Sequence, residues 1–277
     1  MAVKVVTDSA SDIPAELAEE LGISIVPCTV FFGADGFKDG VEITKEEFFH
    51  RLTTGNVMPT TTQPSVGDFL DVYRPLAEAG HDIVSVHVSG KLSGTVNSAR
   101  LAAQELPDAT VETVDTELAS MGVALAAKAA ADAVSAGADA AGAAEAARNA
   151  AASTEVFVVP DTLEYLKRGG RIGGAQALLG SLLSMKPVLK LVDGEVHPHE
   201  KVRTKAKAVQ RMREIAASGG PYREAAVMHW VSDEEADAMV EHLAQFTANP
   251  VVSGSIGASI GAHAGPGVLG FALVKEG

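Results

Sequence analysis

The sequence predicts an α/β fold with two domains: a three-layer α/β/α domain with a parallel sheet over residues 1–153, and an α/β domain with a mixed sheet over residues 154–277. In the first part, short apolar runs rich in β-branched residues alternate with helical patterns, which is typical of βαβ units. In the second part, Asp193-Gly194 separates two strand-like segments, which favours a hairpin. The length of 277 residues also fits two domains better than one.

The first domain is predicted to begin with a strand and then to alternate. We expect strands over residues 3–6, 23–26, 83–88 and 110–114, and helices over 14–21, 44–52, 66–79 and from 93 to about 103. Pro14 suits the first position of its helix, with Ser11 or Asp12 as the cap. Thr44 and Glu47 have the spacing of a capping box.

Three segments of this domain are less regular. Residues 33–40 contain several turns and predict a small irregular insertion, and residues 59–64 form a hydroxyl-rich turn between two prolines. Residues 118–152 are almost pure alanine, with breaks at Gly137 and Gly142. They predict two helices that pack through small residues.

The second domain mixes hairpin and crossover connections, which predicts helices on one face of its sheet. We expect strands over residues 156–159, 188–192, from 195 onward, 225–230, 251–256 and 268–274, and helices over 162–167, 175–185, 204–218 and 233–246. Pro198 keeps its strand at an edge or a bulge. Residues 175–185 are apolar on all sides, which indicates that this helix is buried or lines an apolar space.

The composition excludes several classes of function. The formal charge of −14, from 22 basic and 36 acidic side chains, argues against nucleic-acid and anionic-membrane binding. The single cysteine, Cys28, excludes an internal disulfide and a Cys-rich metal site. The sequence starts directly with a strand, and no window approaches ~18 uninterrupted apolar residues. We therefore expect a soluble cytoplasmic protein with no stable membrane insertion.

The segment from Asp82 to Ala103 is the strongest candidate for a binding site. A buried strand ends in a short loop, and Ser93 stands where the cap of the next helix belongs, followed by Gly94 and Thr95. Free backbone N–H groups and the positive end of a helix dipole bind anions. The alternative is that Ser93 only caps its helix and Gly94 only permits close packing.

Several other motifs do not carry a site. The G-x-S-x-G pattern of residues 257–261 has no acid and histidine after it in the order that a nucleophile elbow requires, so a strand-to-loop passage is favoured. No phosphate-binding P-loop is present. The Gly169-Gly170-Arg171 segment resembles an anion-binding nest only weakly. The competing interpretation is a helix C-cap followed by a solvated arginine.

Candidate metal ligands also have simpler interpretations. His197 and His199 lie on a predicted edge strand without a third ligand nearby, which favours exposed surface. Asp8, Asp12 and Asp115 follow strands and could hold Mg²⁺, although capping and turn formation are favoured over it. We therefore predict no metal site.

The remaining polar groups share a chemical logic. Ser93, the threonine run 60–62 and His263 put hydroxyl and imidazole donors at the ends of loops, where α/β sheets bind ligands. Such donors suit a carboxylate better than a phosphoester, which would attract more lysine and arginine.

Seven ordered motifs resemble the DegV family along the whole chain. They are Thr7-Asp8-Ser9 with Asp12, Thr61-Thr62-Gln63-Pro64, Leu92-Ser93-Gly94-Thr95, Leu163-Glu164-Tyr165-Leu166 with Gly169-Gly170-Arg171-Ile172, Lys186-Pro187, Arg203-Thr204, and Gly261 and His263 with Gly265-Pro266-Gly267. Thr62 replaces the serine that is usual in the second motif, so a hydroxyl is kept.

The resemblance implies a two-domain protein that binds one long-chain fatty acid of the C16–C18 class, such as palmitate, and needs no other cofactor. It implies a lipid-binding protein and not an enzyme by itself. Some members serve as the acyl-binding subunit of a bacterial fatty-acid kinase and present the carboxylate to an ATP-binding subunit. Matched by motif, Thr61, Ser93 and His263 would contact the carboxylate, with Thr62 and Gly94 beside them and Arg203 near the site.

The acyl tail needs an apolar tunnel, because burial of methylene groups supplies most of the affinity. The candidate wall is the apolar segment 175–185, with Leu178, Leu182, Leu183 and Met185. Two other interpretations remain open. One is a stand-alone serine acyl hydrolase or acyltransferase with Ser93 as nucleophile and His263 as base. The other is a substrate domain like that of dihydroxyacetone kinases, which has a related architecture.

Overall fold

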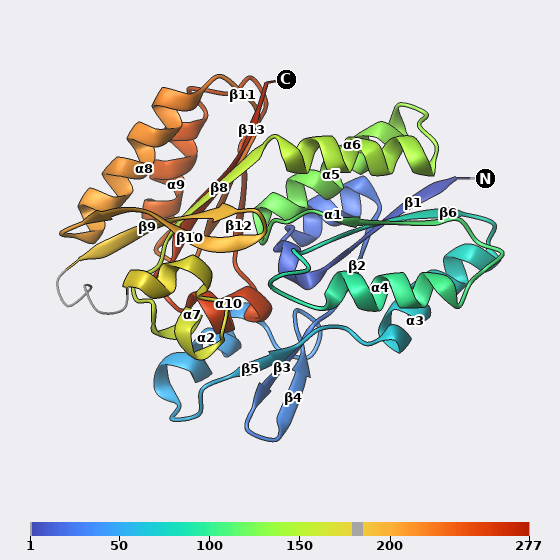
Figure 1. The fold of residues 1–277 in the computed structure, drawn as a ribbon, viewed down its shortest axis with the longest axis horizontal. Helices are drawn as coiled ribbons and strands as arrows, with labels where there is room; N and C mark the ends of the chain where they lie inside the picture. The colour runs from blue at the N-terminus through green and yellow to red at the C-terminus, as the bar shows by residue number, and fades with distance from the viewer. Residues whose placement is uncertain (1, 179–184, 277) are drawn as a thin grey trace.

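The computed structural model describes residues 2–178 and 185–276, and its first part is built on a four-stranded parallel sheet (Figure 1). The strand order is β2-β1-β6-β7, with β1 (Val3–Asp8), β2 (Ile23–Val26), β6 (Asp82–His87) and β7 (Val111–Asp115). All three pairings are parallel. The α/β fold with a parallel sheet is therefore confirmed for this part of the chain.

Helices cover both faces of this sheet, as expected for three layers. On one face, α3 (Val66–Glu78) and α4 (Thr95–Gln104) bury Phe69, Tyr73, Ala99 and Ala102 against the strands. On the other face lie α1 (Ala15–Leu21), α5 (Met121–Ser135) and α6 (Ala140–Ala152). The last two are the predicted alanine-rich helices, and their alanine faces are buried completely where they meet.

The second part is built on a six-stranded mixed sheet of order β10-β9-β8-β13-β11-β12. Its strands are β8 (Thr154–Val159), β9 (Lys186–Val192), β10 (Glu195–Val202), β11 (Tyr222–His229), β12 (Val252–Ser255) and β13 (Leu269–Lys275). The pairing of β11 with β12 is parallel, and the other pairings are antiparallel. The predicted hairpin is present, and the β10 edge strand has a register shift after Pro198.

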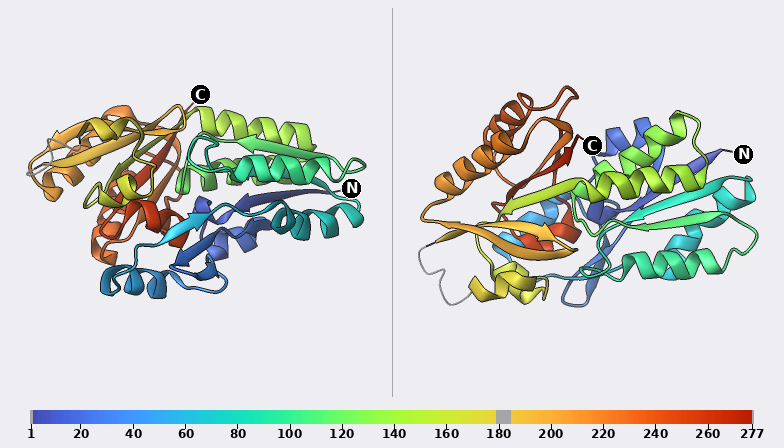
Figure 2. Two further views of the ribbon diagram at one scale, coloured as in Figure 1. Left: turned by 60° about the horizontal axis from the view of Figure 1, so that its bottom comes forward. Right: turned by 45° about the horizontal axis from the view of Figure 1, so that its top comes forward.

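The two faces of this sheet have different neighbours. Phe157 and Val159 of β8 pack beneath α8 (Lys205–Gly219) and α9 (Asp233–Leu243). Val156, which points to the opposite face of β8, belongs to the apolar cluster that contains α5. Because successive residues of a strand point to opposite faces, β8 joins both clusters. Figure 2 shows the two sheets side by side, with the helical layers around them.

A third, three-stranded antiparallel sheet of order β4-β3-β5 corrects two predictions. The expected irregular insertion forms β3 (Thr29–Phe32) and β4 (Asp35–Lys38). The expected turn at 59–64 contains the strand β5 (Thr60–Thr62), because Thr61 pairs with Val30. The helix α2 (Lys45–Thr54) lies between β4 and β5. Thr44 accepts the N–H of Glu47, whereas the Glu47 carboxylate pairs with Arg51 and does not close the capping box.

Short elements complete the fold and correct two further predictions. They are η1 (Ser9–Ser11), α7 (Glu164–Arg168), η2 (Gly173–Leu178) and α10 (Ala258–Ala264). The predicted helix 175–185 is a 3-10 turn up to Leu178, and residues 179–184 lie outside the described residues. The G-x-S-x-G segment begins a helix and is no strand-to-loop passage. None of the helices within residues 2–178 and 185–276 is long and apolar enough to cross a bilayer.

Candidate functional site

A cavity of about 1010 Å³, part of it open to solvent, lies where the three sheets meet. Its apolar wall comes from strands of the mixed sheet, from α7 and α10, and from loops after β6 and beside β12 and β13, with Val88, Leu92, Val156, Val158, Leu166, Leu191, Val196, Met228, Ile256, Ile260, Ala264 and Val268. Its polar lining includes Thr61, Thr62, Gln63, Ser93, Arg171 and His263.

The cavity brings together predicted site residues from distant parts of the chain. Thr61 lies on β5, and His263 lies in the last turn of α10. Thr61 Oγ1 and His263 Nε2 are 2.8 Å apart and hydrogen-bonded. The sequence interpretation put both residues in loops, whereas the structure holds each on a regular element, which restricts their rotamers and separation.

The ring of His263 is neutral at physiological pH. Burial first, and then the positive charge of Arg171, lower its pKa to about 4. Its Nδ1 is buried without a hydrogen-bond partner among the described residues. A Cβ atom on Gly169 would lie 2.1 Å from this Nδ1, so only a glycine leaves room for the ring. The neutral imidazole therefore keeps one N–H and one acceptor nitrogen for the site.

Ser93 faces the cavity and does not cap its helix. The N-cap of α4 is Gly94, and no side chain caps it. Ser93 Oγ is instead 2.8 Å from Thr95 Oγ1, and the N–H of Ser93 donates to the carbonyl of Ser89. The capping alternative is therefore wrong for Ser93. The other alternative holds for Gly94: a Cβ atom there would lie 2.5 Å from Gln63 Nε2, so its glycine permits close packing.

Arg171 supplies a positive charge that the sequence interpretation left in solvent. The chain reverses after α7 at Gly170, where φ is +70°, and the N–H of Arg171 donates to the carbonyl of Leu166. The guanidinium then donates from Nε to the carbonyl of Leu92 and from Nη1 to that of Gly169. No carboxylate pairs with it within residues 2–178 and 185–276. Arg171 thus keeps an unneutralised charge at the cavity.

The other candidate residues lie elsewhere. Arg203 is exposed before α8 and does not line the cavity. Leu178 does not line the cavity itself but is buried in a cluster with Leu166 and Val196, which do line it, and Met185 is half-buried outside the lining. Leu182 and Leu183 lie outside the described residues. The walls are formed by strands instead, and the alternation of apolar residues in 154–159 and 186–196 was the signal for them.

The three acids that could have held Mg²⁺ are engaged in hydrogen bonds. Asp8 accepts the N–H groups of Ala10 and Val88 and pairs with His87 Nδ1. Asp115 accepts the N–H groups of Gly90 and Glu117. Asp12 accepts from Ser120 and Gly257. No group of three potential ligands that could hold a metal ion occurs in the described part of the chain.

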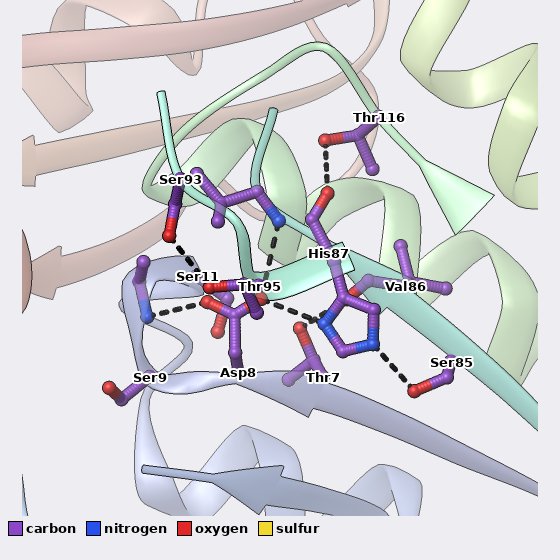
Figure 3. A network of polar contacts seen from close by, with 12 residues as sticks. Thr7, Asp8, Ser9, Ser11, Ser85, Val86, His87, Ser93, Thr95 and Thr116 are labelled. Carbon is purple, nitrogen blue, oxygen red and sulfur yellow. Dashed lines mark hydrogen bonds and ion pairs between the residues drawn. The ribbon is translucent and has the colours of Figure 1, made fainter. Parts of the chain in front are cut away.

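A Ser-His-Asp arrangement does exist, but it is buried. Figure 3 shows the ring of His87 between Asp8 and Ser85, at 2.8 Å and 2.6 Å. Tyr73 donates a further hydrogen bond to Ser85, and these four side chains are completely shielded from solvent. No substrate can reach Ser85, so this network holds β1, β6 and α3 together and is no hydrolase site.

The comparisons with known proteins agree with this architecture. The family model described as "Uncharacterised protein, DegV family" matches residues 2–276. A DegV domain-containing protein of Streptomyces coelicolor is 43% identical over 277 aligned positions, and the match covers 98% of this chain and 98% of the relative.

Two solved structures match the fold over the full length of both chains. One, described as fatty acid binding of a DegV family protein from Thermus thermophilus, is 37% identical with a TM-score of 0.92. The other, DegV from Bacillus subtilis, described as a fatty acid binding protein, is 32% identical with a TM-score of 0.89. The parallel sheet, the mixed sheet and the seven motifs together show that this chain belongs to the DegV family.

Proposed function

We propose that this protein binds one long-chain fatty acid, with the carboxylate at the Thr61, Ser93, His263 and Arg171 cluster and the tail in the apolar cavity. The observation that carries the proposal is the cavity itself, because an apolar wall from the mixed sheet, α10 and neighbouring loops meets a small cluster of donors. The solved relatives from Thermus thermophilus and Bacillus subtilis, described as fatty acid binding, support the same ligand class.

The burial of the lining residues supports one orientation of the ligand. Thr62 and Gln63 are exposed, and Thr61, Ser93 and Arg171 are half-buried. The apolar lining residues Val156, Ile256 and Val268 are almost completely buried. A carboxylate loses hydration at a high free-energy cost, whereas a methylene chain gains by burial. We therefore infer that the headgroup lies toward solvent and the tail toward the interior.

The headgroup cluster suits an anion in its chemistry. When His263 Nε2–H donates to Thr61 Oγ1, the hydroxyl hydrogen of Thr61 is free to donate to a carboxylate oxygen. Ser93 can donate a second hydrogen bond, and the guanidinium of Arg171 supplies the opposite charge. A fatty acid is ionised at neutral pH, so one positive charge and two hydroxyl donors match it.

The tail supplies most of the affinity in this proposal. Burial of a C16 chain at ~0.8 kcal/mol per methylene contributes on the order of 12 kcal/mol before the cost of ordering. The polar cluster then decides which end of the ligand faces outward and which headgroups are accepted. A C16–C18 acid such as palmitate is our proposed ligand.

We further propose that the bound carboxylate is presented to an ATP-binding kinase subunit. A carboxylate oxygen would attack the γ-phosphorus of ATP, ADP would leave, and an acyl phosphate would form. The half-buried headgroup cluster supports this step, because a second protein can reach it. In this proposal the protein itself holds and orients the acid and transfers no group.

The geometry favours the binding function over a stand-alone hydrolase. A nucleophilic serine needs a general base within hydrogen-bond distance. Ser93 Oγ bonds to Thr95, and the described partner of the His263 ring is Thr61. Among the described residues, no histidine is hydrogen-bonded to Ser93 Oγ, which supports binding over hydrolysis.

Mass spectrometry of lipid extracted from the natively purified protein tests the binding proposal. We expect one free long-chain fatty acid per chain. A fluorophosphonate probe, which labels activated serines, should leave Ser93 unmodified. Loss of all bound acid on delipidation, followed by failure to rebind palmitate, would overturn the proposal. Labelling of Ser93 would favour the hydrolase.

A further inference from the structure

The helix that carries His263 has no capping side chain of its own. The helix α10 is seven residues long, begins after Gly257 and ends at Ala264. Ile260, His263 and Ala264 on it line the cavity. A helix leaves its first N–H groups without partners inside the helix, and buried N–H groups need them. The partners of these groups therefore decide how firmly His263 is placed.

Two buried carboxylates from the first part of the chain supply those partners. Asp39 accepts the N–H of Ala258 at 3.0 Å through Oδ1 and the N–H of Ser259 at 2.9 Å through Oδ2. Asp12 accepts the N–H of Gly257 at 2.7 Å through Oδ1. Three successive N–H groups, those of the N-cap Gly257 and of the first two residues of α10, are thus bound by two acids that are 219 and 245 residues away.

Each acid is itself held by other elements. Asp12 also accepts the hydroxyl of Ser120, directly before α5, and its backbone has a left-handed φ of 53°. Lys45 of α2 donates from Nζ to the carbonyl of Ser255 at 2.6 Å and places a positive charge near both carboxylates. A Cβ atom on Gly257 would lie 3.1 Å from Asp39 Oδ1 and 3.3 Å from Asp12 Oδ1, so glycine allows the close approach.

This arrangement is costly for the fold. Both carboxylates are at most 6% exposed. Burial is the main cause that raises the pKa of Asp12 to about 7 and also raises the pKa of Asp39. A neutral capping residue would satisfy the same N–H groups at less cost. Two carboxylates, each with two acceptor oxygens, can instead hold three N–H groups and a hydroxyl in one fixed geometry.

We propose that Asp39 and Asp12 are positioning residues that hold the N-terminus of α10 so that His263 meets Thr61 at the headgroup site. The inference rests on the proposed function for the identity of that site. It assigns the second aspartate of the Thr7-Asp8-Ser9 motif to the placement of a histidine some 250 residues later. The acids act through the helix and do not touch the ligand.

The test is an imidazole ¹⁵N NMR titration of the ligand-free protein, with His263→Gln to assign the signal. The matched pair is Asp39→Ala and Asp139→Ala, because Asp139 also caps a helix, by accepting the N–H of Gly142, but lies on α6 away from the cavity. The more conservative Asp39→Asn keeps one acceptor oxygen. It replaces Asp39→Ala in the titration if Asp39→Ala does not fold. Asp12→Ala is the corresponding variant of the second acid.

We expect the pKa of His263 to rise from about 4 toward its ordinary value of 6.5 in Asp39→Ala, because a loosened α10 lets water reach the ring. A rise of one unit is a tenfold change in proton affinity. Asp39→Asn should show a smaller rise, Asp12→Ala a rise, and Asp139→Ala none. The loss of a negative charge alone would lower this pKa, so a rise separates repositioning from a direct charge effect.

A second readout uses palmitate labelled with ¹³C at the carboxyl carbon. Its bound carboxyl signal should move toward the aqueous value in Asp39→Ala and stay unchanged in Asp139→Ala. An unchanged His263 titration in every Asp39 and Asp12 variant, within about 0.3 unit, would overturn the inference. Failure of wild-type protein to bind palmitate would overturn the proposed function instead, and the ligand-free titration would still decide the role of the two acids.

Discussion

Thr61 and His263 are separated by 202 residues in the sequence, and their side chains meet at 2.8 Å at the edge of the cavity. One comes from the small antiparallel sheet and the other from the helix that connects β12 to β13. This contact brings the first and second parts of the chain together at the proposed headgroup site, so several consequences can be measured there.

Replacement of Thr61 by valine keeps the shape of the side chain and removes the hydroxyl. We expect the Kd for palmitate to rise about tenfold, because a hydrogen bond to a charged group contributes about 1.5 kcal/mol. Isothermal titration calorimetry measures this change. Thr54→Val, on the exposed end of α2, is the control and should leave the Kd unchanged. Equal affinity of Thr61→Val and wild type would show that Thr61 does not bind the carboxylate.

Arg171→Met removes the positive charge and keeps a long apolar side chain. We expect the Kd for palmitate to rise by a factor of ten or more, because a charged hydrogen bond contributes about 1.5–3 kcal/mol. The affinity for hexadecanol, which has no charge, should change little. The ratio of the two affinities, measured by displacement of a fluorescent fatty acid, is the relevant quantity. A parallel loss for acid and alcohol would argue for a packing role instead.

Gly169→Ala tests the space around His263. The added Cβ would lie 2.1 Å from His263 Nδ1, so the ring must move and its bond to Thr61 is lost. We expect weaker palmitate binding, by about tenfold, with a correctly folded protein. Gly67→Ala on α3 is the matched control, since its Cβ meets only Ser65 Oγ at 3.5 Å. Wild-type affinity in Gly169→Ala would contradict the placement of the ring.

The raised pKa of Asp12 leads us to expect a pH-dependent free energy of unfolding. Its pKa is raised to about 7 in the folded protein, above the value of 3.8 in an unfolded chain. The folded state therefore binds the proton more tightly, and the free energy of unfolding falls as the pH rises from about 4 to about 7. A shift of this size corresponds to up to about 4 kcal/mol. Urea denaturation at several pH values should show a flatter dependence for Asp12→Asn than for wild type.

The alanine-rich helices predict a sharp difference between two leucine substitutions. Ala144 on α6 is fully buried in the apolar cluster, whereas Ala141 on the same helix is exposed. Ala144→Leu should lower the free energy of unfolding by about 1–3 kcal/mol or more, because the close-packed α5–α6 contact has no space for it. Ala141→Leu should change it by less than about 0.5 kcal/mol. Similar melting temperatures of the two variants would contradict this packing.

Local patterns predicted most of the secondary structure. The β-branched runs, the alanine-rich segment and the Asp193-Gly194 turn each have one preferred backbone conformation, so their elements are present with small shifts of their ends. Residues 29–38 form a local hairpin whose turn residues were interpreted as an irregular insertion. Residues 60–62 were misjudged because they pair with β3, from Phe31↔Thr60 to Thr29↔Thr62, and so with a segment 29 to 33 residues earlier. Such pairing is decided by tertiary contacts and leaves little local signal.

The sequence pointed to hydroxyls and a histidine that do line the cavity, whereas the positive charge that it put near the site, Arg203, does not line it. Arg171 points inward because Gly170 adopts a left-handed conformation and two carbonyl groups from different segments accept from the guanidinium. Neither cause is visible along the sequence. The apolar wall was expected on one helix, whereas strands line the cavity, since each strand contributes alternate residues to it. The domain boundary at residue 153 stays a prediction.

The apolar cluster that the two larger sheets share has a consequence for how the protein unfolds. The largest cluster of the described residues contains Val84 of the parallel sheet and Val156 of the mixed sheet, with the helix α5 between them. Neither half can lose this packing without exposing the other half to water. We expect a single cooperative transition in scanning calorimetry, with equal calorimetric and van't Hoff enthalpies, although the two larger sheets are separate.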